Sequence, residues 1–274
     1  MYKVVYIGNI MDVPEFISHD KDLKLEFIIA EEEKLSEDLL TFSIVRNVPL
    51  HTVKKSREIS ALLKGKKIDF CIMCSFGQKI TPDTIKETDI YNLHWSSLPE
   101  YKGRHPIYWA IMQNEKKLGI SLHRVAAEID LGEIISKKEI EYYLWLNEKD
   151  AFELLTAKVP ELLQDLKLFL QGKKKPEKNS AGSYYRPVSE AETTISLEKD
   201  TLSDIFNKAR SQARYKGAKL VSGKKTFFVK KLKFGKTPAG KNLSKGEEFT
   251  EKGATWIFLN RAISIKLVDF TEEQ

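Results

Sequence analysis

The chain has 274 residues, 42% of them hydrophobic and 31% charged, which is enough to bury a sizeable core and excludes the composition of a disordered protein. No apolar run approaches the roughly 18 residues that cross a bilayer, and residues 1–9 lack the pattern of a secretory signal, so we expect a cytoplasmic protein with no membrane contact. The formal net charge of +6 indicates an anionic partner, such as a phosphorylated small molecule, RNA or a glutamate-tailed cofactor, unless it reflects only a solvated lysine face.

Short apolar strands alternate with polar helical segments in the first part of the chain. Residues 2–7, 23–30, 68–74 and 89–94 have the pattern of strands, and Thr81-Pro82 predicts the start of a short helix over 81–86. Strands that alternate with helices form a parallel sheet covered on both sides. The predicted fold class is therefore α/β, with a Rossmann-like, mostly parallel sheet and helices on both faces.

The middle of the chain extends this sheet and ends in a helical region. Residues 107–112 predict a helix, and residues 119–125 and 132–143 predict two further strands. Apolar side chains recur at helical spacing across 150–171, where Pro160 either kinks the helix or starts a second segment.

A lysine-rich stretch, residues 172–180, has no apolar face to bury and marks the end of the main domain. We therefore predict a main domain over 1–175 and a smaller C-terminal α+β region over 176–274. The smaller region is expected to contain a helix at 202–212, a polar loop at 235–253, and strands at 225–234, 256–259 and 263–268. The last two strands should form a terminal β-hairpin. The apolar side chains of this hairpin could pack against a second subunit, so we expect a homodimer. They are Trp256, Phe258, Ile263 and Ile265.

The two cysteines, Cys71 and Cys74, lie in the predicted strand at 68–74. An offset of three puts their side chains on opposite faces of a strand, and a zinc site would need further ligands nearby. We therefore expect structural packing, without a metal and without a disulfide.

Polar side chains gather at the end of the strand at 89–94. Side chains alternate along a strand, so Asn92 and His94 point to one side, toward the crevice where α/β sheets bind ligands. An amide beside an imidazole can stabilise an oxyanion and move a proton. A carboxylate is the natural third member because it orients an imidazole, and Asp130, in a turn between two predicted strands, is the best candidate. Each residue alone also has an ordinary interpretation, as a turn cap, a core histidine or a turn former.

The surrounding motifs favour the catalytic interpretation. Residues 92–103 read Asn-Leu-His-Trp-Ser-Ser-Leu-Pro-Glu-Tyr-Lys-Gly, followed by Gly-Ile-Ser-Leu-His at 119–123 and Asp-Leu-Gly at 130–132. This arrangement resembles the signature of the folate-dependent formyltransferases, most strongly over 68–140. The resemblance implies that N10-formyltetrahydrofolate is the formyl donor, that no metal is needed, and that the catalytic residues are Asn92, His94 and Asp130.

The resemblance also implies where the donor and the acceptor bind. The loop at 75–80 matches the folate-side loop of the family in character, and the expected cofactor contacts are Phe76, Gly77, Gln78, Ile80, Ile129 and Gly132. Arg104-His105-Pro106 is most similar to enzymes that formylate nucleotide-linked amino sugars. Arg210 and Lys216 could contact a diphosphate, or belong to a solvated basic face. The full set of expected substrate contacts is Trp95, Ser97, Lys102, Gly103, Arg104, His105, Arg210, Tyr215 and Lys216.

Three positions depart from the family pattern. Trp95, Ser97 and Lys102 stand where a small residue, a leucine and an arginine are usual. None belongs to the three catalytic positions, and Trp95 could line the acceptor pocket as an aromatic wall. The departures therefore concern the acceptor rather than the reaction.

The expected acceptor is a dTDP- or UDP-linked amino sugar, most simply a dTDP-3-amino- or dTDP-4-amino-dideoxyhexose used in surface polysaccharide such as O-antigen. Methionyl-tRNA formyltransferase is the nearest alternative, because of the positive charge and the second region. Residues 172–274 look too short and too broken by polar loop for a complete RNA-binding barrel, so a nucleic acid is not the expected partner. A nucleotide-binding module without catalysis is the second alternative.

Overall fold

The structure is a computed structural model that describes residues 1–273. The chain divides into two compact units, each formed by segments that are not contiguous in sequence. Unit 1 comprises Met1–Gly103, Gly119–Ile140 and Leu154–Tyr184, and unit 2 comprises Arg104–Leu118, Glu141–Glu153 and the chain from Tyr185 onward. The predicted boundary after residue 175 therefore lies within unit 1, and unit 2 also takes two segments from the predicted main domain.

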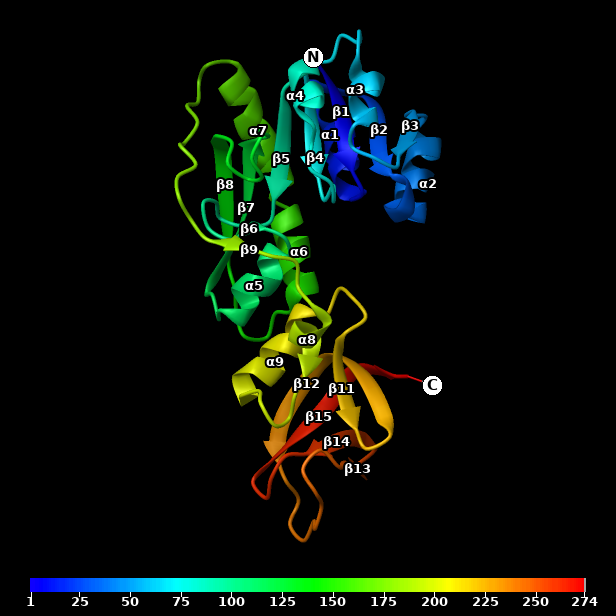
Figure 1. The fold of residues 1–274 in the computed structure, drawn as a ribbon, viewed down its shortest axis with the longest axis vertical. Coiled ribbons are helices and arrows are strands. Elements are labelled where there is room, and N and C mark those ends of the chain that lie inside the picture. Colours follow the sequence, from blue (N-terminus) through cyan, green and yellow to red (C-terminus); the bar gives the residue numbers. More distant parts are fainter. Residues whose placement is uncertain (274) are drawn as a thin grey trace. The chain divides into compact units, whose positions relative to one another are not determined.

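Unit 1 is built on a seven-stranded sheet of order β3-β2-β1-β4-β5-β7-β8 (Figure 1). Its strands are β1 (Tyr2–Gly8), β2 (Leu23–Glu31), β3 (Leu50–Val53), β4 (Phe70–Cys74), β5 (Ile90–His94), β7 (Lys117–Arg124) and β8 (Ile134–Glu141). The pairs among β1 to β5 are parallel, whereas β7 runs antiparallel to β5. The predicted mostly parallel sheet is confirmed. The four-residue strand β3 is not predicted, because its Leu-His-Thr-Val sequence is too short to show a period.

Helices cover both faces of this sheet, as predicted. They are α1 (Asp12–His19), α2 (Glu37–Arg46), α3 (Glu58–Leu63), α4 (Pro82–Glu87) and α7 (Val159–Leu170), with a 3-10 turn at Glu32–Lys34. Helix α6 (Glu148–Thr156) begins in unit 2 and ends in unit 1. Val5 and Ile7 of β1 share a core cluster with side chains of α3, while Val4 and Tyr6, which alternate with them, are equally buried. A strand buried on both faces needs a continuous apolar sequence, which β1 has.

Two helix starts follow from local sequence. Thr81 caps α4 by accepting a hydrogen bond from the Thr84 amide, and Pro82 occupies the first turn. Pro160 occupies the first turn of α7, so it starts a second helix and does not kink a single one. Proline is tolerated there because the first amides of a helix have no partner within it.

Cys71 and Cys74 are both buried in β4, and neither forms a disulfide. Burial raises the pKa of the Cys71 thiol well above its ordinary value. Cys71 belongs to the apolar cluster of the sheet. The structural role predicted for these residues is confirmed.

Unit 2 contains a six-stranded sheet of order β10-β11-β12-β15-β14-β13. Its strands are β10 (Thr194–Ile195), β11 (Ala218–Ser222), β12 (Lys225–Lys236), β13 (Glu248–Glu251), β14 (Ala254–Phe258) and β15 (Ile263–Glu272). Its helices are α5 (Pro106–Met112), α8 (Glu190–Thr193) and α9 (Leu202–Ser211). The antiparallel pair β14 and β15 is the predicted terminal hairpin, seen in orange to red in Figure 1. A short ladder of β6 (Lys102–Gly103) and β9 (Tyr184–Tyr185) stands outside both sheets.

The predicted polar loop at 235–253 is wrong in its last part, because β13 lies within it. Phe249 of β13 is 8% exposed and stacks on Trp256, with ring centroids 6.1 Å apart. Because this strand has one buried aromatic side chain in a stretch rich in lysine and glutamate, its sequence lacks the apolar–polar alternation that predicts a strand. Unit 2 nevertheless forms a sheet of six strands, so the polar loop interrupts this region less than predicted.

The apolar side chains of the terminal hairpin pack inside unit 2. Ile265 is fully buried, Phe258 is 6% exposed, and Ile263 packs against the same core cluster. Phe258 and Ile265 therefore supply no surface for a second subunit, whereas Trp256 and Ile263 are half-buried, and the homodimer stays a prediction.

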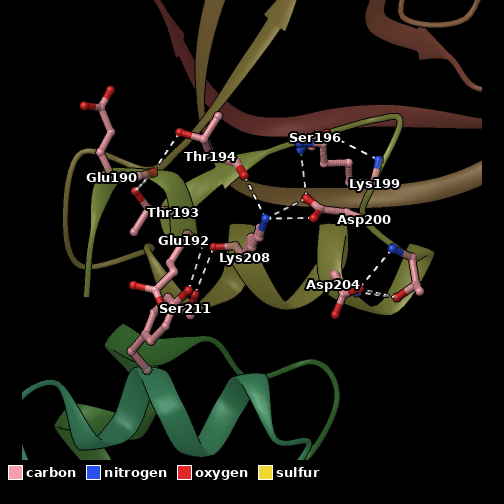
Figure 2. A network of polar contacts seen from close by, with 12 residues as sticks. Glu190, Glu192, Thr193, Thr194, Ser196, Lys199, Asp200, Asp204, Lys208 and Ser211 are labelled. Atoms are coloured by element: carbon pink, nitrogen blue, oxygen red, sulfur yellow. Dashed lines mark hydrogen bonds and ion pairs between the residues drawn. The ribbon is translucent and has the colours of Figure 1, made fainter. Parts of the chain in front are cut away.

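The buried ammonium group of Lys208 links α9 to the segment that precedes it (Figure 2). Lys208 Nζ donates to the Thr194 carbonyl at 2.8 Å and to both carboxylate oxygens of Asp200, at 2.9 and 2.7 Å. A capping box of Thr201 and Asp204 fixes the start of the helix. Lys208 therefore has a structural role within unit 2.

Candidate active site

Three polar side chains of unit 1 meet on β5 and β7. Asn92 and His94 lie on β5, and His123 lies opposite Asn92 on the antiparallel strand β7. Their exposed fractions are only 8%, 7% and 2%. Asn92 Nδ2 lies 3.0 Å from His123 Nε2, and the two histidine rings meet edge to face, with centroids 6.3 Å apart. Asn92 is therefore part of a buried polar cluster and does not cap a turn.

Asp130 joins this cluster from the loop between β7 and β8. Its φ of 53° lies in the left-handed region, which aspartate tolerates better than most residues. Its carboxylate lies 3.7 Å from His94 Nδ1 and 3.4 Å from His123 Nε2, and accepts a 2.9 Å hydrogen bond from the Gly103 amide. The structure thus brings the three predicted catalytic residues together. The contact with His94 is longer than a hydrogen bond, so Asp130 acts on His94 mainly through its charge.

Burial and nearby donors set the charges of the site. Burial opposes ionisation of Asp130, but the charge that His94 carries in acid, the contact with His123 and the Gly103 amide hold its pKa at about 2. Burial lowers the pKa of His94, and the charge of Asp130 opposes this only in part. At neutral pH the site therefore contains an ionised carboxylate beside a neutral imidazole, which can accept a proton.

The Tyr101 carbonyl determines which nitrogen of His94 carries the proton. It lies 2.9 Å from His94 Nε2. A carbonyl oxygen can only accept, so the hydrogen-bond network places the proton of the neutral ring on Nε2 and leaves a lone pair on Nδ1. Because Nδ1 faces Asp130, a proton that reaches Nδ1 forms an imidazolium next to a carboxylate, which is a favourable arrangement.

Two residues shape the loop that carries Asp130. A Cβ on Gly132 would lie 1.8 Å from the Arg124 carbonyl oxygen, so only glycine fits there. Asn179 Nδ2 donates to the carbonyls of Asp130 and Gly132, at 2.8 and 2.9 Å. Asn179 is not predicted as a site residue, because it lies in the lysine-rich stretch at 172–180 and no local pattern marks it.

The predicted folate loop follows β4 and is held by one buried carboxylate. Glu31 accepts from the Gly77 amide at 2.8 Å and from Lys34 at 3.0 Å. Burial opposes ionisation of Glu31, but these donors keep its pKa below the ordinary value. Gln78 fastens the same loop to Lys54 and Ser56 through its side chain. Glu31 is a positioning residue that the sequence pattern does not reveal.

The apolar members of the predicted cofactor set differ in exposure. Ile80 is 4% exposed, and Phe76 packs against the core cluster that contains Ile80, so both side chains anchor the loop in the core of unit 1. Ile129 is 48% exposed, and its neighbour Leu131 is 38% exposed. The cofactor contacts themselves stay predictions.

The predicted acceptor residues of unit 1 are largely engaged within it. Trp95 is 8% exposed and Lys102 is 4% exposed, with its ammonium group 2.8 Å from the Ser180 carbonyl. The Ser97 hydroxyl donates to Glu139 at 2.6 Å, and the Gly103 amide binds Asp130 as described. Lys102 and Ser97 therefore have structural partners, whatever they contact in a complex.

Among the predicted acceptor residues of unit 2, Arg104 and His105 lie at the surface, whereas Arg210 is buried. His105 caps α5 with a φ of 56°, and its Nδ1 accepts from the Val188 amide at 3.1 Å, while Arg104 is exposed. Arg210 is 7% exposed; its guanidinium binds the Asn207 side chain and lies over the Tyr142 ring, 4.8 Å from the centroid.

Two further predicted acceptor residues lie at the surface of unit 2. Lys216 pairs with Glu273 at 3.2 Å and lies 3.6 Å from the Phe228 ring centroid. Tyr215 is 43% exposed. Their roles in substrate binding, like that of Arg210, stay predictions.

Unit 2 contains an ion pair between the buried Glu148 and the partly exposed Arg214, which is not predicted from the sequence. Glu148 is 2% exposed, its Oε1 lies 3.2 Å from Arg214 Nε, and its Oε2 has no hydrogen-bond partner. The Arg214 guanidinium covers the Phe152 ring, 3.7 Å from its centroid. Burial raises the pKa of Glu148 to about 7, against the opposing charge of Arg214. The two residues are far apart in sequence, so no motif connects them.

A mostly parallel sheet with an acid–base cluster on neighbouring strands defines an α/β domain of the ligand-binding type. Residues 29–162 match the family model described as formyl transferase. The match takes in a little under half of the chain, which in that segment is similar to the formyl transferase family.

The proteins that resemble this chain carry the names of different enzymes. The chain is 29% identical over 182 residues to methionyl-tRNA formyltransferase of Sulfurihydrogenibium sp. (strain YO3AOP1), and this match covers 62% of the chain and 57% of that protein. The chain thus spans a little over half of the length of that curated relative. It also resembles a solved structure of HypX from Aquifex aeolicus in complex with tetrahydrofolic acid, with a TM-score of 0.72, 15% identity, and coverage of 97% of this chain and 43% of that one.

A second solved structure is similar over nearly the whole of both chains. It is the N-formyltransferase from Helicobacter canadensis in complex with folinic acid and dTDP-3-aminofucose, with a TM-score of 0.69, 18% identity, and coverage of 97% of this chain and 99% of that one. At this identity the likeness establishes the shared fold.

Within residues 1–273, no group of three or more histidine, cysteine, aspartate or glutamate side chains is arranged to hold a metal ion. Over the same residues, none of the helices has the length and apolar character that a membrane span requires.

Proposed function

We propose that this protein is a folate-dependent N-formyltransferase that moves the formyl group of N10-formyltetrahydrofolate to the amine of a nucleotide-linked amino deoxysugar. The observation that carries the proposal is the buried cluster of Asn92, His94 and Asp130 within a formyl transferase domain. A dTDP-linked 3-amino or 4-amino dideoxyhexose is the favoured acceptor, because a structure similar over nearly both whole chains is a complex with dTDP-3-aminofucose. Such a reaction would serve cytoplasmic synthesis of surface polysaccharide.

The surroundings of Asp130 suit a folate. Ile129 and Leu131 precede and follow Asp130 in the chain, and they are 48% and 38% exposed. A flat ring with polar edges binds best where apolar walls adjoin a few fixed polar groups. When bound, the donor supplies an activated formyl group. Residues 129–132 and the loop at 75–80 are the segments that would hold it.

Each residue of the cluster then has a task. The amine nitrogen bonds to the formyl carbon, the bond from that carbon to the folate nitrogen breaks, and the amine proton passes to His94 and then to the folate nitrogen. Asn92 donates to the formyl oxygen as negative charge develops there, and His94 accepts the proton on Nδ1. Asp130 stabilises the resulting imidazolium across 3.7 Å.

The direct test is formyl transfer from N10-formyltetrahydrofolate, followed as tetrahydrofolate release. The acceptors are dTDP- and UDP-linked 3-amino and 4-amino sugars, with initiator methionyl-tRNA beside them. We expect turnover of one sugar nucleotide, and a loss of about 100- to 10,000-fold in kcat for His94→Ala. Full activity of His94→Ala would show that the catalytic assignment is wrong.

Methionyl-tRNA formyltransferase is the second candidate, for two reasons. The curated relatives carry that name, and unit 2 forms a six-stranded sheet with many lysines on its strands. Turnover of charged tRNA alone, lost progressively as salt is raised, would select this acceptor and keep the catalytic cluster. A nucleotide-binding module without catalysis is disfavoured, because a buried neutral imidazole beside a carboxylate has little use in binding alone.

A further inference from the structure

Unit 1 contains a cavity of about 320 Å³ beside the first residues of β1 and β3. Lys3 of β1, Phe27 of β2 and His51 of β3 line it. Lys3 and His51 each stand two residues before an apolar side chain of the core cluster shared with α3, namely Val5 and Val53. Because side chains alternate along a strand, the cavity lies on the face of the sheet that α3 covers.

The connection between α3 and β4 forms another part of the wall. Lys66, Lys67 and Ile68 belong to this connection and line the cavity. The Asp69 amide donates to the Lys3 carbonyl at 2.9 Å, and the Lys3 amide donates to the Asp69 carboxylate at 2.6 Å. These two hydrogen bonds hold the connection against β1, so lysines from two distant parts of the chain meet at one cavity.

The wall of this cavity carries more positive than negative charge. Lys3, Lys66 and Lys67 are exposed, and over residues 1–273 none of their ammonium groups lies within ion-pair distance of a carboxylate. Glu26, which also lines the cavity, is half-buried and pairs with Lys24 at 2.9 Å. A concave surface lined by charge of one sign raises the local concentration of counter-ions. The cavity therefore favours an anionic ligand.

The wall also has apolar parts, at Phe27, Pro49 and Ile68. Ligand pockets commonly combine apolar walls with a few polar groups, at volumes of about 300 to 1,000 Å³. A phosphate ester carries a charge of about −1.5 to −2 at neutral pH, and lysine binds phosphate as a point charge. We propose that this cavity binds the phosphate group of a small phosphorylated molecule, whose charge the three lysines balance.

The proposed phosphate site is separate from the catalytic cluster. Lys3 is the second residue of β1, whereas His94 is the last residue of β5. The strands β1, β4 and β5 are parallel, and their register aligns Gly8 with Cys74 and Cys74 with Leu93. At about 3.3 Å per residue, Lys3 and His94 lie about 20 Å apart along the strand direction. The phosphate site therefore adds to the proposed formyl transfer and does not depend on it.

Proton NMR of the full chain tests binding at this cavity without any turnover. The probes are AMP, inorganic phosphate and adenosine, added at constant pH and ionic strength, and the readout is the ring C–H resonances of His51. We expect AMP to shift these resonances saturably, while those of His19, which is 65% exposed and outside the cavity, stay in place. The absence of a saturable shift with both phosphate probes, or equal binding of adenosine and AMP, would overturn the proposal.

The two phosphate probes distinguish the source of the phosphate group. Tighter binding of AMP than of inorganic phosphate would identify the ligand as a phosphate ester that also uses the apolar wall. Equal binding would identify it as free phosphate. Either result supports a phosphate site.

Two double substitutions separate this site from a general effect of net charge. Lys66→Gln/Lys67→Gln should weaken the binding of AMP about tenfold, a typical loss for two exposed ion contacts. Lys173→Gln/Lys175→Gln removes the same charge at two exposed lysines outside the cavity, and it should bind AMP as the wild type does. Equal affinity of the two double variants for AMP would contradict the proposal.

A catalytic variant separates the phosphate site from the proposed active site. His94→Ala should bind AMP as tightly as the wild type, because His94 lies at the other end of the parallel strands. Markedly weaker binding in this variant would place AMP at the catalytic cluster and overturn the proposal. Failure of the wild-type protein to formylate any acceptor would count against the proposed function alone, since the binding measurement needs no turnover.

Discussion

Asp130 in unit 1 and Glu148 in unit 2 are both buried carboxylates, yet their pKa values move in opposite directions, to about 2 and about 7. Burial alone would raise both. Asp130 has two histidines and the Gly103 amide around it, whereas Glu148 depends on Arg214 and leaves one oxygen unpartnered. The number and placement of donors, not the degree of burial, decides whether a buried carboxylate stays ionised.

The largest expected effect is on the ionised member of this pair. Asp130→Asn preserves the shape of the side chain but removes the charge that stabilises protonated His94, so kcat should fall about 1,000-fold. The measurement is the rate of tetrahydrofolate release with saturating acceptor. Asp83→Asn, at an aspartate 81% exposed on α4, is the control and should retain full activity. A kcat above one tenth of the wild-type value in Asp130→Asn would remove the carboxylate from the mechanism.

The second effect concerns Glu148 and the stability of unit 2. Its pKa is about 7 in the folded protein against an ordinary 4.5, so the folded state binds the proton more tightly. The stability contributed by the protonated form is fully present below pH 4.5 and is lost as the pH rises through 7, a change of about 3 kcal/mol at most. Denaturant unfolding between pH 5 and 8 should show this decline in the wild type.

The same experiment on Glu148→Gln provides the comparison, because glutamine cannot titrate. Its free energy of unfolding should vary less over this range than that of the wild type. Parallel curves for the two proteins would mean that Glu148 is ionised throughout, and the contrast with Asp130 would disappear.

The smallest expected effect tests how the Asp130 loop is held. Asn179→Ala removes two hydrogen bonds to the carbonyls of Asp130 and Gly132. We expect a loss of about 1–2 kcal/mol in the free energy of unfolding and a several-fold lower kcat, since the carboxylate is less well placed. Asn242→Ala, at an exposed asparagine, serves as the control. An unchanged kcat would show that the loop keeps its shape without Asn179.

Sequence alone predicts the elements whose side chains repeat or whose ends carry strong signals. The continuous apolar run of β1 and the Thr81-Pro82 start of α4 are examples, and the motif around Asn92 and His94 indicates the site. Strand β13 and the ion pair of Glu148 with Arg214 are not predicted, because each depends on residues brought together only by folding.

The site shows the same division. Alternation places Asn92 and His94 on one face, and a turn motif suggests Asp130. The partners that fix them are a backbone carbonyl at Tyr101, an asparagine in a lysine-rich stretch and a histidine on the neighbouring strand β7. Backbone acceptors leave no trace in a sequence, so the proton positions of the site could not be predicted from it.

The interleaved composition of unit 2 bears on how the protein is made. Helix α5 buries Ile107, Tyr108 and Ile111 and packs against α9, and Asn114, just after α5, accepts a hydrogen bond from Asn207 of α9. Helix α5 emerges from the ribosome long before α9. The apolar face of α5 therefore stays exposed until α9 has been synthesised. The nascent chain is therefore exposed to aggregation during this interval, and a chaperone that shields amphipathic segments should raise the yield of active protein more than one that acts after release.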